Sequence, residues 1–305
     1  MADAVVSRAV FRRPRHRPRR QRWTGWGFVG PFLIVFALAL VAPVCYATYL
    51  SLFRQQLIGG NAFVGLANYH LALSDPRFWQ SLRRVLLFLA VQVPVMLVLA
   101  LLAALALDSA RLRWAAVYRL SIFLPYAVPA VVASLMWGFM YGSQFGLVAR
   151  LSSLLRVGLP DPLSGSWVLV SIGNIVTWEF AGYNMLIFYA ALRAVPGELY
   201  EAASIDGATA LGIVRWIKLP ALRPALMVAG VFSVIGSLQL FNEPNILQQL
   251  APDAIGTNFT PNMYAYNLSF AGQEYNYSAA IAIVMGVITM IIAYAVQLYG
   301  RRRAA

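Results

Sequence analysis

The sequence of 305 residues is poor in the residue types that build disulfide frameworks, metal centres and phosphate-binding loops. Cys45 is the only cysteine and lies in an apolar stretch, which excludes an intrachain disulfide and a cysteine-rich metal site. His16 and His70 are the only histidines, and they lack metal-ligand spacing. Lys218 is the only lysine and follows no glycine-rich turn, so the chain has no phosphate-binding loop for ATP.

Charge is also scarce. Charged residues make up 11% of the chain and hydrophobic residues 60%, and the mean hydropathy is +0.68. Ordinary globular proteins carry roughly a quarter charged residues. This composition does not suit a soluble fold, and we predict an all-α, polytopic membrane protein.

Six apolar segments are long enough to cross the membrane as helices, which requires about 20 residues for a hydrocarbon core about 30 Å thick. They are predicted at 27–53, 85–107, 122–141, 167–192, 225–241 and 278–298. Together they form one predicted membrane domain, which extends over 23–300 between a basic tail at 1–22 and a second basic tail at 301–305. Pro125 and Pro129 fall near the start of the third span, where neighbouring helices can satisfy the freed carbonyls.

The basic residues indicate the orientation of these spans. Segments on one side of the six-span bundle hold 18 of the 24 Arg and Lys residues, and the opposite side holds six. Cytoplasmic loops carry the excess of basic residues. We therefore predict a multi-pass protein of the inner (cytoplasmic) membrane with both termini in the cytoplasm. The arginine-rich tail adjoins the first span, so we expect it to fix topology and contact anionic membrane lipid, not nucleic acid.

The predicted cytoplasmic segment 196–220, PGELYEAASIDGATALGIVRWIKLP, has the pattern of two short helices separated by a turn. Glu198 complements the dipole at the start of the first helix, and Gly207 stands where a left-handed residue can end it. Glu201 and Asp206 add further negative charge to this helix. An acidic helix rich in small residues favours docking into a groove with basic rims. A solvated surface helix without a partner is the alternative.

The same segment resembles the signature of binding-protein-dependent ABC importer permeases, E-A-A-x3-G-x9-I-x-L-P. The seven matching positions are Glu201, Ala202, Ala203, Gly207, Ile217, Leu219 and Pro220. The flanks at 184–192 and 219–226 are similar to those of the maltose-type carbohydrate branch. The resemblance implies the type I permease fold of ABC importers, with this segment as the coupling loop. The residues that it assigns to contact with an ATPase subunit are Glu201, Ala202, Ala203, Asp206, Gly207, Leu219 and Pro220.

The resemblance also implies the other components of a transporter. The expected partners are a second homologous permease subunit, two ATP-binding subunits and an extracytoplasmic solute-binding protein. ATP and Mg are then used by the ATP-binding subunits, and this chain binds no cofactor of its own. It is expected to be a translocation subunit that works by alternating access, not an enzyme.

Polar and aromatic residues of the fourth and fifth spans are candidates for contact with the solute. Glu179 is the one acidic residue inside a predicted span, and its insertion costs about 2.5 to 3.5 kcal/mol, so it should face protein or water. Aromatic rings can stack on the C–H faces of a sugar. By the same resemblance, the predicted substrate-binding residues are Trp178, Glu179, Tyr183, Asn184, Gln239, Asn242 and Glu243. Helix packing is the alternative role for the residues of the fourth span and for Ser233, Gly236 and Ser237. For Glu243 the alternative is a solvated position in an outer loop.

The lack of arginine among these residues disfavours an anionic solute, because carboxylates without a basic partner would repel it. We therefore expect a neutral sugar, a di- or oligosaccharide. Two alternatives stay open: an ABC importer permease for another solute, and a proton-coupled secondary transporter that uses Glu179 as its carrier. The second alternative leaves the complete coupling signature unexplained.

Overall fold

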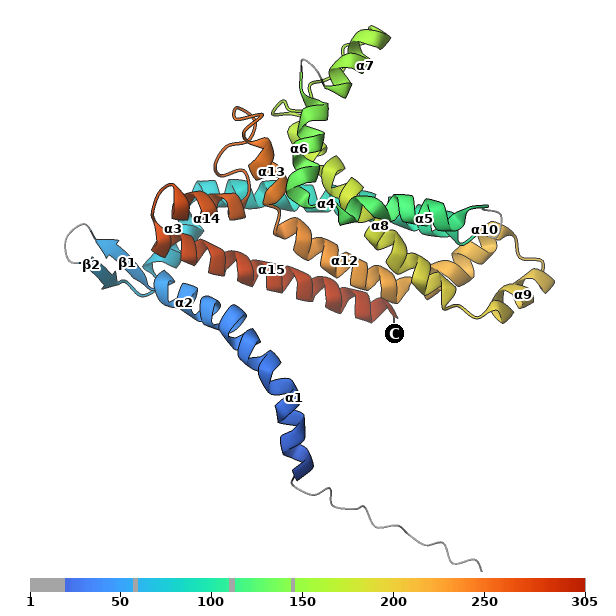
Figure 1. Cartoon of the computed structure of the whole chain (residues 1–305), viewed down its shortest axis with the longest axis horizontal. Helices are drawn as coiled ribbons and strands as arrows, with labels where there is room; N and C mark the ends of the chain where they lie inside the picture. Colours follow the sequence, from blue (N-terminus) through green and yellow to red (C-terminus); the bar gives the residue numbers. More distant parts are fainter. Residues whose placement is uncertain (1–19, 57–59, 110–112, 144–145, 305) are drawn as a thin grey trace, which may run out of the picture. The chain divides into compact units, whose positions relative to one another are not determined.

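The computed structural model describes residues 20–56, 60–109, 113–143 and 146–304, and divides the chain into two units, Met1–Tyr49 and Leu50–Ala305 (Figure 1). The first unit is helical where it is described. Its helix α1 (Arg20–Phe36) continues through a π-helical turn, Ala37–Val41, into α2 (Ala42–Ser51), which ends in the second unit. Most of the predicted basic tail at 1–22 lies outside the described residues.

The second unit contains one β-hairpin and a set of helices (Figure 1). Strands β1 (Phe53–Gln56) and β2 (Gly60–Phe63) pair antiparallel with Phe53 opposite Phe63. Residues 196–220, the predicted coupling loop, are called the coupling segment below. The helices before it are α3 (Ala67–Ser74), α4 (Pro76–Leu107), α5 (Ala115–Phe123), η2 (Leu124–Ala127), α6 (Ala130–Tyr141), α7 (Leu147–Leu155) and α8 (Val168–Arg193). Those that follow are α9 (Gly197–Ile205), α10 (Ala210–Ile213), η3 (Val214–Lys218), α11 (Leu219–Ala221), α12 (Arg223–Leu238), α13 (Asn242–Leu247), α14 (Pro261–Phe270) and α15 (Tyr275–Ala304).

Within the described ranges, five helical segments are long and apolar enough to cross a membrane, and one bent pair would make six. The five are Trp26–Ser51, Pro76–Leu107, Val168–Arg193, Arg223–Leu247 and Tyr275–Gly300. Helix α4 begins nine residues before the predicted span at 85–107, because the Asp75 carboxylate caps it and Pro76 suits its first turn. Helix α15 continues through the predicted tail at 301–305 as far as Ala304.

The predicted third span at 122–141 is not one continuous helix. Two segments, Ala115–Ala127 and Ala130–Tyr141, meet at an angle of 98°. Val128 has extended backbone (φ −81°, ψ 127°) because it precedes Pro129, and the proline ring disfavours the helical conformation of the residue before it. The prolines that we expected a continuous helix to tolerate therefore end one helix and begin another.

The predicted fifth span at 225–241 is also interrupted. Helix α12 ends at Leu238, and α13 begins at Asn242 after three residues outside regular helix. The apolar helix thus stops before the residues that we predicted to face the solute. Those residues lie at or after its end.

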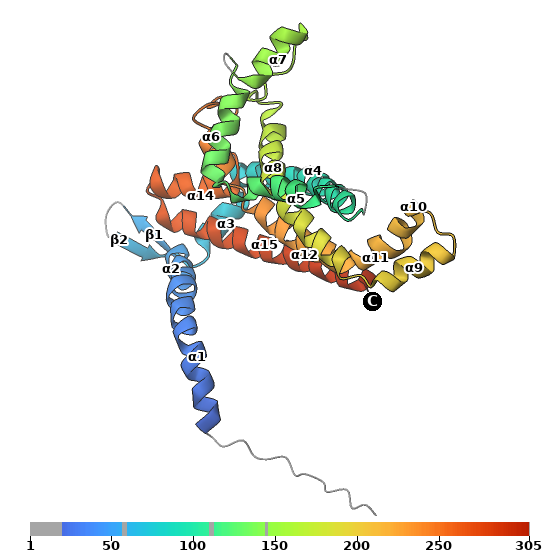
Figure 2. The same cartoon turned by 45° about the vertical axis from the view of Figure 1, so that its right-hand side comes forward.

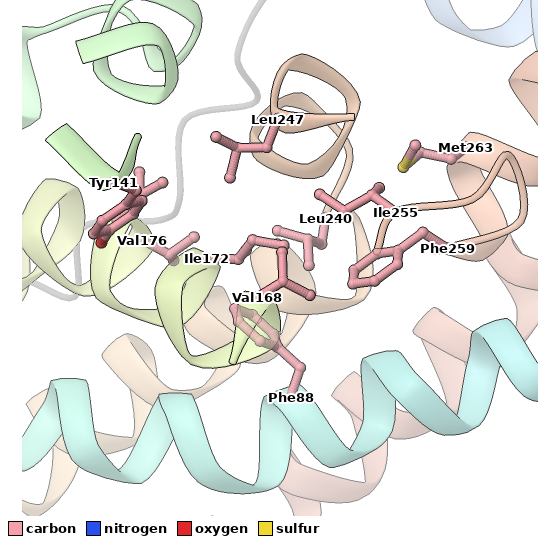
Figure 3. Packing of buried hydrophobic residues seen from close by; sticks show 11 residues of the cluster. Phe88, Tyr141, Val168, Ile172, Val176, Leu240, Leu247, Ile255, Phe259 and Met263 are labelled. Carbon is pink, nitrogen blue, oxygen red and sulfur yellow. The ribbon is translucent and has the colours of Figure 1, made fainter. Parts of the chain in front are cut away.

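The interior of the second unit is formed where α4 and α8 cross other helices. Near one end of α8, Phe88 of α4 packs with Val168, Ile172 and Leu247 in one buried cluster (Figure 3). Near the other end, Ala100 and Ala104 of α4 pack in a second cluster with Met185, Phe188 and Leu192 of α8. Small side chains on α4 let the larger side chains of α8 fill the space between the helices.

Gly182 of α8 marks the closest approach between two helices. A Cβ atom on Gly182 would collide with the carbonyl group of Ile122 and lie 2.8 Å from the Cα atom of Phe123 in α5. The missing side chain is therefore required for α5 to lie against α8.

The β-hairpin and the segment α9–α10 lie at opposite ends of the second unit (Figure 2). Helix α4 runs along most of the distance between these ends. Because it has 32 residues, its axis is about 48 Å long, which exceeds the thickness of a hydrocarbon core.

Candidate functional site

A cavity of about 400 Å³ lies in the interior of the second unit, between α4, the bend of the third segment, α8 and the broken fifth segment. Its volume falls within the range of small-molecule sites, about 300 to 1,000 Å³. The aromatic side chains that line it are Phe88, Tyr126, Phe180, Tyr183, Phe232 and Phe241. The polar side chains are Gln92, Asn184, Ser233, Ser237, Gln239, Asn242 and Glu243. Among the described residues, none that lines the cavity is basic.

Five of the seven predicted substrate-binding residues line this cavity: Tyr183, Asn184, Gln239, Asn242 and Glu243. Two of them, Tyr183 and Asn184, come from α8, and a neighbouring residue holds each side chain in place. The ring of Tyr183 stacks on that of Tyr126, with centroids 4.8 Å apart. The amide of Asn184 is held by a 3.0 Å hydrogen bond to the Phe180 carbonyl, and its side chain is buried.

The other two predicted residues, Trp178 and Glu179, do not line the cavity. The ring of Trp178 makes an edge contact with Trp137 of α6, with centroids 5.8 Å apart. Glu179 is 3% exposed, and neither of its carboxylate oxygens has a hydrogen-bond partner among the described residues. The ring contact with Trp137 fits the alternative role of Trp178, helix packing, better than contact with the solute.

Residues of α4 and of the bend were not predicted as part of the site. Phe88, Gln92 and Met96 of α4 line the cavity, and so does Tyr126 from the bend. Gln92 had a sequence signal, because it is the only polar side chain in the apolar run at 85–107. It receives a 3.4 Å hydrogen bond from the Ser237 hydroxyl and donates a long one, 3.5 Å, to Thr177 of α8. One amide thus joins three helices at the cavity wall.

The small residues of α12 lie at the cavity wall, and Ser237 also contacts α4 through Gln92. Ser233, Gly236 and Ser237 line the cavity, and a Cβ atom on Gly236 would meet no atom within 4 Å. Gly236 leaves open space beside the cavity, while Ser237 holds α12 to Gln92 of α4. The break after Leu238 then turns Gln239, Asn242 and Glu243 toward the same space.

The coupling segment projects from the second unit as a helix, a turn and a second short helix (Figures 1 and 2). Gly207 has φ +74°, the left-handed conformation expected where α9 ends. The Thr209 side chain caps α10 by accepting a hydrogen bond from the Gly212 amide. The second helical stretch runs from α10 through η3 into α11, where Pro220 occupies one of the first two positions.

Most of the predicted coupling residues are open to solvent. Glu201, Ala202, Asp206 and Gly207 are exposed, while Ala203, Leu219 and Pro220 are partly buried. Large apolar side chains flank the acidic ones: Ile205 is 87% exposed and Leu211 is 77% exposed. An exposed surface that combines apolar and charged side chains is typical of a protein–protein contact.

Lys218 connects the coupling segment to α4. Its Nζ atom lies 2.6 Å from Oδ2 of Asp108, which ends α4, and 5.6 Å from the ring centre of Tyr200 in α9. The Tyr200 hydroxyl is buried without a hydrogen-bond partner among the described residues. Burial raises the pKa of Tyr200, and the negative charge of Asp108 raises it further. A single lysine therefore ties both halves of the coupling segment to the helix that lines the cavity.

At the opposite end of α4, Asp75 joins three elements. Its Oδ2 atom accepts hydrogen bonds of 2.6 Å from the Tyr264 hydroxyl of α14 and 2.8 Å from the Tyr277 hydroxyl of α15. Its Oδ1 atom accepts the Arg77 amide at 2.8 Å. Burial opposes ionisation of Asp75, but these hydrogen bonds outweigh it and lower its pKa. Burial and the bond to Asp75 raise the pKa of Tyr264 to about 12.

Comparison with known proteins gives a consistent result. Residues 70–305 match the family described as binding-protein-dependent transport system inner membrane component. The lactose transport system permease protein of Rhizobium radiobacter is 32% identical over 289 residues, which cover 91% of this chain and 94% of that protein. The trehalose/maltose transport system permease protein of Thermococcus litoralis is also 32% identical over 289 residues, 93% of this chain and 96% of the relative.

The fold is similar to that of a solved transporter subunit. A chain from the bacterial alginate ABC transporter, in complex with an alginate pentasaccharide-bound periplasmic protein, superposes with a TM-score of 0.83. The two share 20% sequence identity, and the match covers 93% of this chain and 96% of that chain. At this identity the likeness concerns the fold alone.

Proposed function

This chain belongs to the family of binding-protein-dependent transport system inner membrane components, and we propose that it is the permease subunit of an ATP-driven sugar importer. It is a multi-pass membrane protein and a transport component. The cargo that we propose is a neutral di- or oligosaccharide, delivered by an extracytoplasmic binding protein. The named relatives for lactose and for trehalose/maltose support a sugar over other solutes.

The observation that carries the importer proposal is the exposed coupling segment at one end of the second unit. Its acidic and apolar side chains are available to a partner, and Lys218 ties it to α4. We propose that two ATP-binding subunits supply the ATP and Mg chemistry and that one of them docks on Glu201, Asp206 and Gly207. A second, homologous permease completes the membrane part.

The cavity walls support a neutral sugar. Stacked rings, such as Tyr126 and Tyr183, can cover the C–H faces of a pyranose, while amides and Glu243 can bind its hydroxyl groups. An anionic solute would meet Glu243 without a compensating basic residue in the described wall. Alternating access then exposes this cavity first outward and later inward, as ATP-dependent contacts change the populations of the two states.

The orientation that we propose has both termini in the cytoplasm. The coupling segment is then cytoplasmic, and the β-hairpin with the start of α15 faces outward. The basic excess on the coupling-segment side supports this orientation.

The test uses proteoliposomes that contain this chain with its second permease, its ATPase and its binding protein. ATP hydrolysis is measured with the binding protein loaded from a panel of di- and oligosaccharides. We expect stimulation by one loaded form and sugar uptake that requires ATP. If the assembly forms but no sugar stimulates it, the carbohydrate assignment fails while another solute stays possible. Uptake that follows a proton gradient without ATP would contradict the importer function and favour a carrier role for Glu179.

A further inference from the structure

A second cavity, of about 590 Å³, lies at the hairpin end of the second unit and shares no lining residue with the central cavity. The residues that line it belong to strand β1, helix α3, the turn before α15 and the start of α15. None of the predicted site residues belongs to it. Its volume is that of a small-molecule site.

The walls of this outer cavity are rich in side-chain amides. Five line it: Gln55, Gln56, Asn68, Gln273 and Asn276. Each amide offers both donors and acceptors, as a ligand with many hydroxyl groups requires. Arg54 and Glu274 contribute one positive and one negative charge, so the lining carries no net charge. The ring of Tyr277 adds an apolar face. This combination suits a neutral carbohydrate better than an ion or an apolar molecule.

Hydrogen bonds to the backbone hold the buried amides of this wall in place, and one of their acceptor atoms is unpaired. Asn68 is fully buried, and its Nδ2 atom donates to the carbonyls of Ser51 and Phe53 at 2.8 and 2.7 Å. Its Oδ1 atom has no hydrogen-bond partner among the described residues. Asn276 is 7% exposed and donates to the Leu50 carbonyl at 2.9 Å. Buried polar atoms are rarely left unpaired, so the free oxygen of Asn68 indicates a missing donor.

The backbone at Gln273 supports the same conclusion. Gln273 has φ +55°, a left-handed conformation that glycine adopts more easily than a residue with a side chain. The neighbouring residue, Gly272, could adopt this conformation easily, but the left-handed residue is Gln273. The bond from the Glu274 amide to the Leu268 carbonyl, 2.8 Å, holds the turn after α14. The unfavourable backbone conformation at Gln273 therefore coincides with an amide side chain at the cavity. Strained backbone of this kind is often found at functional sites.

We propose that the outer cavity binds one sugar unit of the incoming oligosaccharide before the solute enters the central cavity. The proposal rests on the importer function, because it requires the hairpin end to face the outside. The amides supply hydrogen bonds to the hydroxyl groups, and Tyr277 lies against the ring. A polar loop of the binding protein is the competing occupant.

The experiment measures protection of an introduced cysteine in the complete transporter, reconstituted in proteoliposomes without the binding protein. Cys45 is first replaced by serine. Gln56→Cys, which is exposed at the cavity, is then labelled with a membrane-impermeant maleimide in the presence of lactose, maltotriose or arabinotriose. Leu66→Cys is the matched control, because Leu66 is 71% exposed near the same end but does not line the cavity.

We expect at least one of the three sugars to slow labelling of Gln56→Cys, about threefold at twice its dissociation constant, and to leave Leu66→Cys unchanged. The added change Gln273→Gly should abolish this protection. It removes one amide and relieves the left-handed backbone, so unfolding cannot explain the loss. Retained protection in this variant would count against the assigned wall.

Two other results overturn the proposal. The same labelling is then repeated with the unloaded binding protein added, and protection by that protein, but by none of the sugars, would make the cavity a docking site for it. No protection by either would leave it without a carbohydrate role. ATP hydrolysis stimulated by the loaded binding protein is measured in the same vesicles. If loaded binding protein stimulates ATP hydrolysis but no sugar protects Gln56→Cys, only the outer sugar site is contradicted. If a sugar protects Gln56→Cys but loaded binding protein does not stimulate ATP hydrolysis, the importer function is contradicted instead.

Discussion

The Nζ atom of Lys218 lies 2.6 Å from Oδ2 of Asp108 and thereby fastens the coupling segment to the C-terminal end of α4. An aspartate at that end is unfavourable by itself, since the partial negative charge of the helix terminus repels it. The lysine removes this repulsion. Because α4 also carries Gln92 at the central cavity, the ion pair connects the predicted coupling segment to a helix that lines this cavity.

Breaking this ion pair should weaken coupling more than assembly. We expect Lys218→Met and Asp108→Asn each to reduce the stimulation of ATP hydrolysis by loaded binding protein about tenfold, which corresponds to about 1.4 kcal/mol. The reversed pair, Asp108→Lys with Lys218→Asp, should recover part of it. Stimulation that is unchanged in both single variants would rule out the ion pair as a coupling contact.

Gly207 should be required for the shape of the coupling segment. Its φ of +74° is unfavourable for a β-branched residue, by roughly 1 to 2 kcal/mol, so Gly207→Val should redirect the chain after α9. We expect transport to be lost while membrane insertion is retained. Gly197→Val is the control, because Gly197 has no left-handed backbone and no atom within 4 Å of an added Cβ. Wild-type transport by Gly207→Val would argue against the docking interpretation.

Local sequence patterns predicted the regular parts of this fold well. The predicted span at 167–192 differs from α8 by one residue at each end, because its apolar run is long and uninterrupted by proline. The left-handed turn at Gly207 followed from the position of a glycine after a helical pattern. In both cases the residues that determine the structure are close together in the sequence.

The cavity was predicted less completely, because its shape depends on two breaks whose geometry is not local. We expected Pro129 to be tolerated within one continuous helix, whereas the chain bends there by 98°, and Tyr126 of the bend stacks on Tyr183 of α8. Trp178 and Tyr183 were therefore assigned to the same site, although only Tyr183 lines it. The polarity of Gln92 was visible in the sequence, but its helical neighbours were not.

Gln92 should contribute to solute binding from the wall of α4. Gln92→Leu keeps the size of the side chain but removes its donors and acceptor, and we expect sugar uptake to fall about tenfold. Val91→Leu is the control, because Val91 is 61% exposed and does not line the central cavity. Initial uptake rates in proteoliposomes distinguish the two. Equal losses in both variants would assign Gln92 to helix packing only.

The cluster of Asp75, Tyr264 and Tyr277 predicts how stability depends on pH. The pKa of Asp75 is lowered in the folded chain, so its stabilisation is complete above the unfolded pKa of about 3.9 and is lost as pH falls below it. The pKa of Tyr264 is raised to about 12, so its stabilisation is complete below the unfolded value of about 10 and disappears as pH rises through 12.

Thermal unfolding of the full chain in detergent, followed as a function of pH, tests this cluster. Asp75→Asn should remove the acid-dependent loss of stability, and Tyr264→Phe should remove part of the alkaline loss. If both variants keep the wild-type pH profile, the cluster does not hold α4 to α14 in solution.

Gly182 should tolerate no larger residue. Gly182→Ala adds a Cβ atom that collides with the Ile122 carbonyl, and overpacking of this kind costs about 1 to 3 kcal/mol. We expect a lower melting temperature and less assembled transporter. Gly230→Ala in α12, where an added Cβ meets nothing within 4 Å, should leave both unchanged. Equal behaviour of the two variants would contradict the close approach of α5 and α8.

The length of α4 has a consequence for which sequence changes this subunit can accept. An inserted residue between Gln92 and Asp108 would rotate one end of the helix against the other by about 100° and lengthen it by about 1.5 Å. Gln92 could then face the cavity, or Asp108 could reach Lys218, but not both. The number of residues between these two positions is therefore constrained as strictly as their identity. Point substitutions at the positions between Gln92 and Asp108 should be far better tolerated than single insertions or deletions there.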